Sequence, residues 1–183
     1  YTHQVLDHSA VFAPITKASF RLNAEAADLI ADKAVCIATE QRNGPVHIDV
    51  PISVADTPAT DRNTRRAPAS DTVPSGGDLT QAREWLAEAE RPISVIGLDA
   101  IQQQAGSAIQ RFLETHQVPF ITSYKAKGVL PEDHSLCLGG AGLSPLADKH
   151  LLPLLRDADL VLCIGYDPIE MRPGWRDVWD LTR

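Results

Sequence analysis

The order of apolar runs and glycines over residues 91–128 constrains the fold more than any other feature of the chain. A short apolar run, Ile93–Ile96, is closed by Gly97, and a second, Val118–Ile121, follows some twenty residues later. Between them, apolar residues recur at the spacing of a helix. The helical positions are Ala105, Ile109, Phe112, Leu113 and His116. Two buried strands joined by a crossover helix form a β-α-β unit of parallel strands. The chain is therefore predicted to be an α/β protein with a Rossmann-like parallel sheet flanked by helices.

The residues after this unit predict a further helix and strand of the same sheet. Ser144-Pro145 is an N-cap followed by proline at the first helical position, so a helix should begin there. Pro153 should kink or restart that helix. The run Asp159–Ile164 is almost entirely apolar, which predicts a strand buried on both faces. Gly139–Gly142 is expected to be a flexible stretch.

The first part of the chain predicts a separate, smaller piece of α/β structure. Thr2–Leu22 is expected to be a loop leading to a short extended piece. Residues 23–51 then show the pattern of a helix followed by a strand. We interpret this helix and strand as the last α-β unit of a sheet, which has too few strands in this chain to be complete. Residues 57–77 are rich in Pro, Thr, Ser, Asp and Gly, a composition typical of a linker. We divide the chain into residues 1–55, a linker over 56–78 and a main domain over 79–183.

Composition limits the classes of partner. The formal net charge is −7, which argues against binding to nucleic acid or to an anionic membrane surface. The basic run Arg62–Arg66 is interpreted as a solvated part of the linker. No apolar run approaches the roughly 18 residues that span a bilayer, and no leader peptide is visible at the start. Cys36 and Cys163 fall in helical and strand patterns, where thiols behave as small core residues, and a reducing, cytoplasmic location is expected.

Glycines mark where a ligand would bind. Gly97, Gly128 and Gly165 follow predicted strands or lie in the turns after them, and Gly140 and Gly142 are placed to reach the same edge. In an open α/β sheet, ligands bind beyond the carboxyl ends of the strands, so a nucleotide crevice is predicted there. The alternative is that these glycines only form tight turns, because the GxGxxG spacing that seats a pyrophosphate is absent. The histidines show no metal-binding spacing, and no metal site is predicted.

Four motifs resemble a known superfamily. APITK at residues 13–17 and GPVHIDVP at residues 44–51 resemble the end of the pyrimidine-binding domain of thiamine-diphosphate enzymes. KGVLPEDH at residues 127–134 and GYDPIE at residues 165–170 resemble the central domain of the same enzymes. Within the superfamily, the chain is most similar to acetolactate (acetohydroxyacid) synthases, and GYDPIE resembles the catabolic type.

The resemblance implies an enzyme that condenses or decarboxylates 2-oxo acids with thiamine diphosphate and Mg²⁺. The catalytic glutamate of such enzymes lies upstream of Tyr1, and the GDG…N motif that holds Mg²⁺ and the diphosphate lies downstream of Arg183. The chain is therefore expected to be an internal fragment without a catalytic residue, with a main domain cut short, and to hold neither cofactor by itself. Lys17 matches a lysine of the substrate channel in these enzymes. Expected partners are the remaining domains of the same polypeptide and further copies in a homo-oligomer.

Biosynthetic members of the superfamily bind FAD in the central domain, at positions that match Gly97, Gly128, Gly140, Gly142 and Gly165. Two departures predict that FAD is not held firmly here. The glycine cluster after the first strand is replaced by Gly97-Leu98-Asp99, and the arginine after the last glycine is replaced by Tyr166-Asp167. Asp99 and Asp167 would also repel a pyrophosphate.

Two alternatives remain open. In the first, the full-length enzyme that contains this chain is another 2-oxo acid decarboxylase or an acyl-CoA lyase of the same superfamily. In the second, the chain is a stand-alone nucleotide-binding module that shares the central fold.

Overall fold

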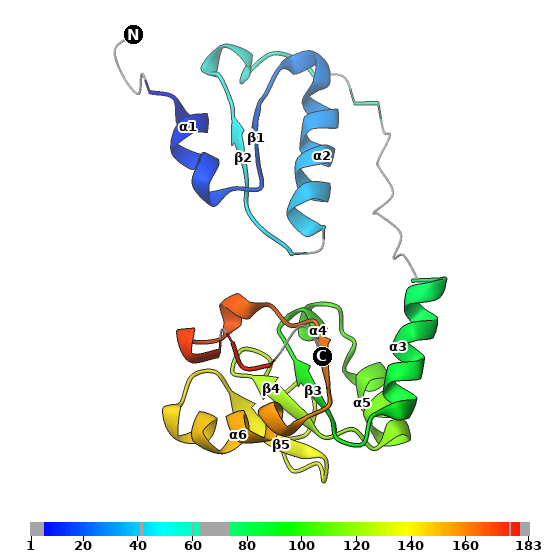
Figure 1. Ribbon diagram of the computed structural model, residues 1–183. Helices are drawn as coiled ribbons and strands as arrows, with labels where there is room; N and C mark the ends of the chain where they lie inside the picture. The colour runs from blue at the N-terminus through cyan, green and yellow to red at the C-terminus, as the bar shows by residue number, and fades with distance from the viewer. Residues whose placement is uncertain (1–5, 41, 60, 63–73, 176, 180–183) are drawn as a thin grey trace. The chain divides into compact units, whose positions relative to one another are not determined.

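The computed structural model describes residues 6–40, 42–59, 61–62, 74–175 and 177–179 (Figure 1). The chain divides into two compact units, residues 1–73 and 74–183. The division falls within the stretch that the sequence suggests as a linker. No helix among the described residues combines the length and the apolar character needed to cross a membrane.

A four-stranded parallel sheet forms the centre of the C-terminal unit. Its strands are β3 (Pro92–Ile96), β4 (Phe120–Ser123), β5 (Cys137–Ala141) and β6 (Leu160–Ile164). They lie in the order β5-β4-β3-β6, and all three pairings are parallel. Val95 in the middle of β3 pairs with Ile121 on one side and Cys163 on the other. The predicted parallel sheet is confirmed, with β4 beginning two residues later than expected.

Helices cover both faces of this sheet (Figure 1). On one face, α3 (Gly77–Glu88), α4 (Asp99–Gln102) and α5 (Gly106–His116) contribute apolar side chains to a core with Ile96 and Phe120. On the other, α6 (Pro145–Asp157) packs Leu151 and Leu155 against Val95 and Ile121. Successive residues of each strand point to opposite faces, so the same four strands serve both cores.

The amino edge of the sheet is fixed by Asp159, just before β6. Its carboxylate accepts hydrogen bonds from the backbone N–H groups of Glu90 at 2.8 Å and Arg91 at 2.9 Å. Burial raises the pKa of Asp159, but these backbone donors outweigh burial, and its pKa lies below the ordinary value. One carboxylate thus holds the starts of two adjacent strands together.

One local expectation for this unit is wrong, and a second is contradicted in part, since the helix does not restart at Pro153. Gly139 and Gly140 belong to strand β5, where pairing with β4 fixes them in extended structure. The pairing register between β4 and β5 shifts between Phe120 and Ile121, and Ile121 pairs with Gly139. Gly139 has φ +121, a backbone conformation that glycine adopts at such an irregularity because it has no Cβ. Pro153 lies inside α6, which continues unbroken from residue 145 to 157. Proline has no N–H to donate to the carbonyl of Lys149, and Lys149 is an exposed residue of the helix.

Strand β6 is less buried than predicted. It is the last strand in the described sheet order, and its residues are half-buried except for Cys163, which is exposed. An edge strand has a neighbour on one side only, which leaves room for solvent. Cys163 is therefore not a core residue, and Cys36 is only half-buried.

The N-terminal unit contains a two-stranded parallel sheet. Strands β1 (Ala18–Arg21) and β2 (Val46–Asp49) are joined by α2 (Ala27–Thr39), and the unit begins with α1 (His8–Phe12) where a loop is predicted. Asn23 caps the entry to α2 as expected, since its side chain accepts a hydrogen bond from Ala26 N at 2.8 Å. Short 3₁₀ turns cover Ala13–Ile15, Ala24–Ala26 and Ile52–Val54 here, and Pro168–Glu170 and Pro173–Trp175 in the C-terminal unit.

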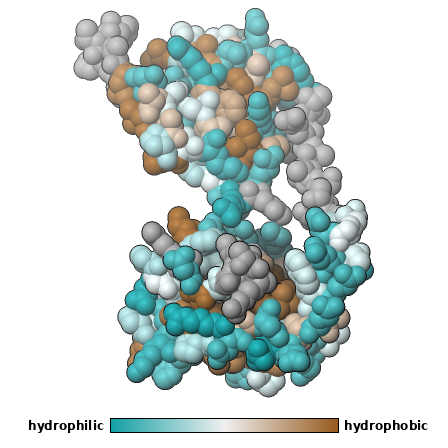
Figure 2. Space-filling model, viewed as in Figure 1, coloured by the Kyte–Doolittle hydropathy of each residue, from teal (hydrophilic) through white to brown (hydrophobic). Residues whose placement is uncertain are grey.

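The N-terminal unit buries few apolar side chains. Among its described residues only Ala34 is fully buried. Large apolar side chains are exposed instead, and Figure 2 shows brown apolar surface on the side where α1 lies. The exposed residues are Leu6, Val11, Phe12, Ile15, Leu29, Val35, Val50 and Ile52.

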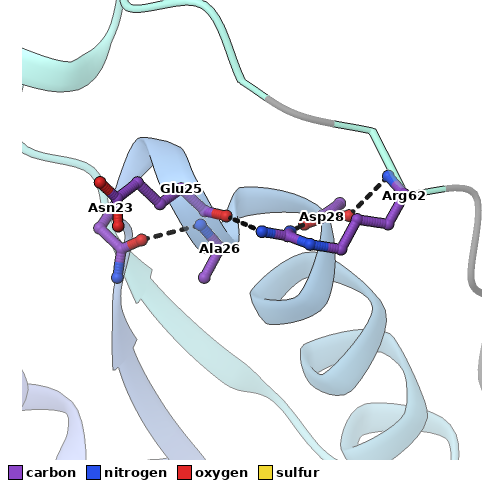
Figure 3. Close-up of polar contacts among 5 residues, drawn as sticks. All are labelled: Asn23, Glu25, Ala26, Asp28 and Arg62. Carbon is purple, nitrogen blue, oxygen red and sulfur yellow. Dashed lines mark hydrogen bonds and ion pairs between the residues drawn. The ribbon is translucent and has the colours of Figure 1, made fainter.

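Arg62 is not the solvated linker residue that the composition suggests. Its guanidinium pairs with the Asp28 carboxylate at 2.6 Å and also donates to the carbonyl of Glu25 at 2.6 Å (Figure 3). Its backbone N–H donates to Asp28 as well, and this bond is the main reason why the pKa of Asp28 is lowered. The chain is thus attached to the first turn of α2 at Arg62. Residues 63–66 of the basic run lie outside the described residues.

The two-sided core can be tested with two identical substitutions in α6. Leu155 is 1% exposed and Leu146 is 71% exposed. Leu155→Ala should lower the free energy of unfolding by about 2–5 kcal/mol, because it leaves a cavity against the sheet. Leu146→Ala should change it by less than about 0.5 kcal/mol. Urea denaturation of both variants measures the difference, and equal losses would contradict the placement of α6.

Candidate functional site

The carboxyl edge of the parallel sheet brings together three of the five glycines that the sequence selects, Gly97, Gly142 and Gly165. Strands β3, β5 and β6 are followed directly by Gly97, Gly142 and Gly165, and β4 ends at Ser123 before the turn that contains Gly128. Because all four strands run in the same direction, their carboxyl ends meet at one edge.

One segment crosses this whole edge. Gly165–Trp175, which we call the edge-crossing segment, leaves β6 and ends beside β5. Its first residue accepts a hydrogen bond from Asp99 N at 3.1 Å, beyond the end of β3. Further along, Arg172 N donates to the carbonyl of Gly142 at 3.2 Å, at the end of β5. Met171 and Trp175 from this segment are buried in the core that α6 covers.

At the centre of the edge lies Glu170, whose side chain is buried, with 3% of the residue exposed. Leu98 N, after β3, donates to both carboxylate oxygens, at 3.1 and 3.0 Å. Asp167 N donates to Oε1 at 3.0 Å, and the hydroxyl of Ser123, at the end of β4, donates to Oε2. The carboxylate therefore receives donors from two strand ends and from its own turn.

Asp148 forms a second buried carboxylate at the β5 side of the edge. It is 1% exposed and accepts from Gly142 N at 2.9 Å and from the guanidinium of Arg172 at 2.7 Å. Asp148 belongs to α6, so this pair fastens the edge-crossing segment to that helix. Charge-assisted hydrogen bonds of this type are the stronger ones in proteins.

Three of the predicted crevice glycines face other parts of the chain. A Cβ at Gly97 would lie 2.6 Å from Oε1 of Glu170 and even closer to the backbone of Gly165 and Tyr166. A Cβ at Gly142 would collide with the sulfur of Met171, and one at Gly165 would lie 2.6 Å from the backbone nitrogen of Ala100. The close approach that these glycines permit is used by the edge-crossing segment and α4.

The other two glycines lie apart from this packing. Gly128 has φ +86, and nothing lies within 4 Å of the position of a Cβ, so it serves a turn. Gly140 faces the aliphatic part of Lys127, with the nearest carbon at 3.3 Å. Lys127 itself pairs with Glu132 at 3.1 Å. Whether any of the five glycines contacts a nucleotide stays a prediction.

Lys17 lies in the N-terminal unit and is occupied by a helix end. Its ammonium donates to the carbonyls of Ile37 at 2.5 Å and Glu40 at 3.3 Å, at the end of α2. A cation at this position satisfies carbonyls that have no helical partner and favours the helix dipole. The predicted role of Lys17 in a substrate channel stays a prediction.

The surroundings of Tyr166, just after β6, favour its neutral form. Burial raises the pKa of Tyr166 to about 12, with further contributions from Cys163, Glu170 and Asp167. Among the described residues, no group of three or more His, Cys, Asp or Glu side chains is placed to hold a metal ion. The two buried carboxylates of the edge, Glu170 and Asp148, are both hydrogen-bonded to donors of the chain itself.

The sequence reasoning did not identify Glu170, Ser123, Asp148 or Arg172 as members of one site. For Glu170 a signal existed, because Asp167-Pro168-Ile169-Glu170 has the D-x-x-E spacing of a capping box. The structure contains that box: Asp167 accepts from Ile169 N at 3.1 Å and Glu170 accepts from Asp167 N. The other three residues show no local pattern.

Comparison with known proteins identifies the family to which this architecture belongs. The model of one protein family, described as the thiamine pyrophosphate enzyme central domain, matches residues 79–178. An acetolactate synthase of Bacillus subtilis is 32% identical over 180 residues, which cover 97% of this chain and 31% of that enzyme. An oxalyl-CoA decarboxylase of Escherichia coli is 29% identical over 170 residues, which cover 89% of this chain and 28% of that enzyme. The chain thus spans about a third of the length of these relatives.

A solved structure shares the fold. The X-ray structure of a candidate thiamin diphosphate-dependent enzyme from Mycobacterium smegmatis superposes with a TM-score of 0.73 at 23% identity. The match covers 92% of this chain and 34% of that one.

Titration of Tyr166 tests the burial at the edge. The fold favours the neutral phenol, so its contribution to stability is complete below about pH 10 and is lost as the pH rises through about 12. The difference in tyrosinate absorbance between the native protein and Tyr166→Phe should therefore develop near pH 12. A difference spectrum that develops near pH 10 in the folded protein would show that the phenol is solvated.

Proposed function

Because the chain belongs to the thiamine pyrophosphate enzymes through its central domain, we propose that it is part of an acetolactate synthase-like enzyme that condenses 2-oxo acids such as pyruvate. The observation that carries this proposal is the family match over residues 79–178, together with the likeness to an acetolactate synthase over nearly the whole chain. The GYDPIE motif at residues 165–170 supports the catabolic type of that enzyme.

In this proposal the chain supplies structure and leaves the chemistry to other parts of the polypeptide. Thiamine diphosphate, when bound, stabilises the carbanion formed from a 2-oxo acid. Among the described residues, no group of three or more His, Cys, Asp or Glu side chains could hold Mg²⁺. We therefore assign no catalytic step to residues of this chain.

Lys17 is the one residue here that we propose to lie along the substrate channel. A lysine at this point would attract the carboxylate of a 2-oxo acid. In the structure its ammonium is bound to the carbonyls at the end of α2. Its influence on a substrate would therefore be that of a fixed positive charge rather than of a mobile side chain.

The exposed apolar surface of the N-terminal unit supports the proposal that other protein segments bind to it. A unit with a two-stranded sheet and one fully buried apolar side chain among its described residues has little core of its own. We propose that the remaining domains of the polypeptide, and a further copy in a homo-oligomer, cover this surface.

A second candidate is a decarboxylase or acyl-CoA lyase of the same superfamily, and the likeness to an oxalyl-CoA decarboxylase supports it. The third is a stand-alone nucleotide-binding module. Saturable, tight binding of ADP or coenzyme A by the purified chain would favour the module over both enzymes.

An activity assay separates the roles of the chain and its parent. The purified chain, supplied with pyruvate, thiamine diphosphate and Mg²⁺, should form no acetolactate, because it contributes no catalytic group. The longer polypeptide that contains this sequence should form acetolactate under the same conditions. Turnover by the chain alone would contradict the structural role, and a parent that only decarboxylates its substrate would favour the second candidate.

Size-exclusion chromatography with light scattering tests the apolar surface. The purified chain should associate in a concentration-dependent manner, and Ile52→Asp should weaken this association because Ile52 is 88% exposed and apolar. A matched substitution at an apolar position of the C-terminal unit that is similarly exposed, Ile169→Asp at 79%, should leave it unchanged. A monomer at all concentrations would exclude self-association through this surface.

A further inference from the structure

Glu170 occupies the place where a parallel sheet of this kind offers donors to an anionic ligand. Backbone N–H groups at the carboxyl ends of parallel strands are the usual partners of phosphate groups. Here the N–H of Leu98, after β3, and the hydroxyl of Ser123, at the end of β4, both donate to the Glu170 carboxylate. The N–H of Asp167 completes the set.

We propose that Glu170 is an internal anion that determines the ligand specificity of this edge. Its carboxylate occupies the donors that a phosphate would need, so the edge binds neither FAD nor ADP. A buried carboxylate is stable only when it is well hydrogen-bonded, and the donors at hand satisfy it. The site therefore has its anion supplied by the chain itself.

The packing of the backbone supports the same conclusion. The side of Gly97 where a Cβ would lie is filled by the backbone of Gly165 and Tyr166 and by Glu170. Met171 fills the corresponding side of Gly142. A ligand as large as a dinucleotide would have to displace the edge-crossing segment, which is also fastened by Arg172 to Asp148. Removal of the Glu170 carboxylate alone should therefore leave a cavity, lined by the same donors, that fits one small carboxylate. We call this cavity the seat.

Glu170→Ala tests this seat directly. It leaves the donors of Leu98, Asp167 and Ser123 without their acceptor, and the melting temperature should fall by roughly 5–10 °C. Sodium formate or acetate should then raise the melting temperature of the variant by several degrees in a saturable manner, compared with sodium chloride at equal ionic strength. If the variant is unfolded in chloride, its refolding yield from urea in formate and in chloride gives the same readout.

Two controls isolate the seat. Glu170→Gln keeps it filled, because its amide oxygen can accept from Leu98 N while its NH₂ group faces the Ser123 hydroxyl, which can rotate to accept. This variant should be more stable than Glu170→Ala and should not respond to formate. Glu90→Ala removes a carboxylate that is 84% exposed, and its melting temperature should match the wild type in both salts.

Calorimetric titration of the unaltered chain with FAD and with ADP completes the test. No saturable heat is expected with either ligand, and Glu170→Ala should also fail to bind ADP, since the seat accepts only a small anion. Saturable binding of FAD or ADP to the wild type would overturn the proposal. So would a formate effect that is the same in Glu170→Ala and in Glu90→Ala.

Discussion

The burial of one carboxylate explains much of the architecture of the C-terminal unit. A charged group that leaves water needs hydrogen-bond donors around it, and Glu170 obtains them from the end of β3 at Leu98, the end of β4 at Ser123 and the start of its own turn at Asp167. These donors lie at or just after the ends of three different strands, and one carboxylate can reach them because the parallel strands end at the same edge of the sheet. The chain after β6 crosses this edge and brings Glu170 to the three donors.

Carboxylates also join separate segments of the chain where the strands of the C-terminal unit begin and in the N-terminal unit. Asp159 joins the starts of β3 and β6 through two backbone N–H groups, and Asp28 attaches Arg62 to the first turn of α2. Each of these carboxylates joins segments that lie far apart in the sequence. The excess of acidic residues, which from composition alone only excludes some classes of partner, therefore also has structural roles inside the chain. The two units differ in their cores: the C-terminal unit packs apolar side chains on both faces of its sheet, and the N-terminal unit leaves many of them exposed.

The features that could be predicted from the sequence depend on local or periodic signals. The apolar run Ile93–Ile96 and the cap at Ser144 depend on neighbouring residues, and both are confirmed. The strand at Gly139 and the unbroken helix at Pro153 were missed because pairing with β4 and packing of α6 on the sheet override local preference. The site was harder to predict, because Glu170 reaches donors 47 and 72 positions away, and such contacts leave no spacing to recognise.

The contact between Gly142 and Met171 has an evolutionary consequence. With Met171 in the core, any side chain at position 142 collides with its sulfur, so each of the two residues restricts what the other can become. Gly97 is restricted differently, because a Cβ there would meet the backbone of Gly165 and Tyr166 as well as Glu170, whatever residue stands at position 170. Position 142 can therefore gain a side chain only if Met171 changes or moves with it, whereas position 97 stays a glycine for as long as the backbone of the edge-crossing segment keeps this path.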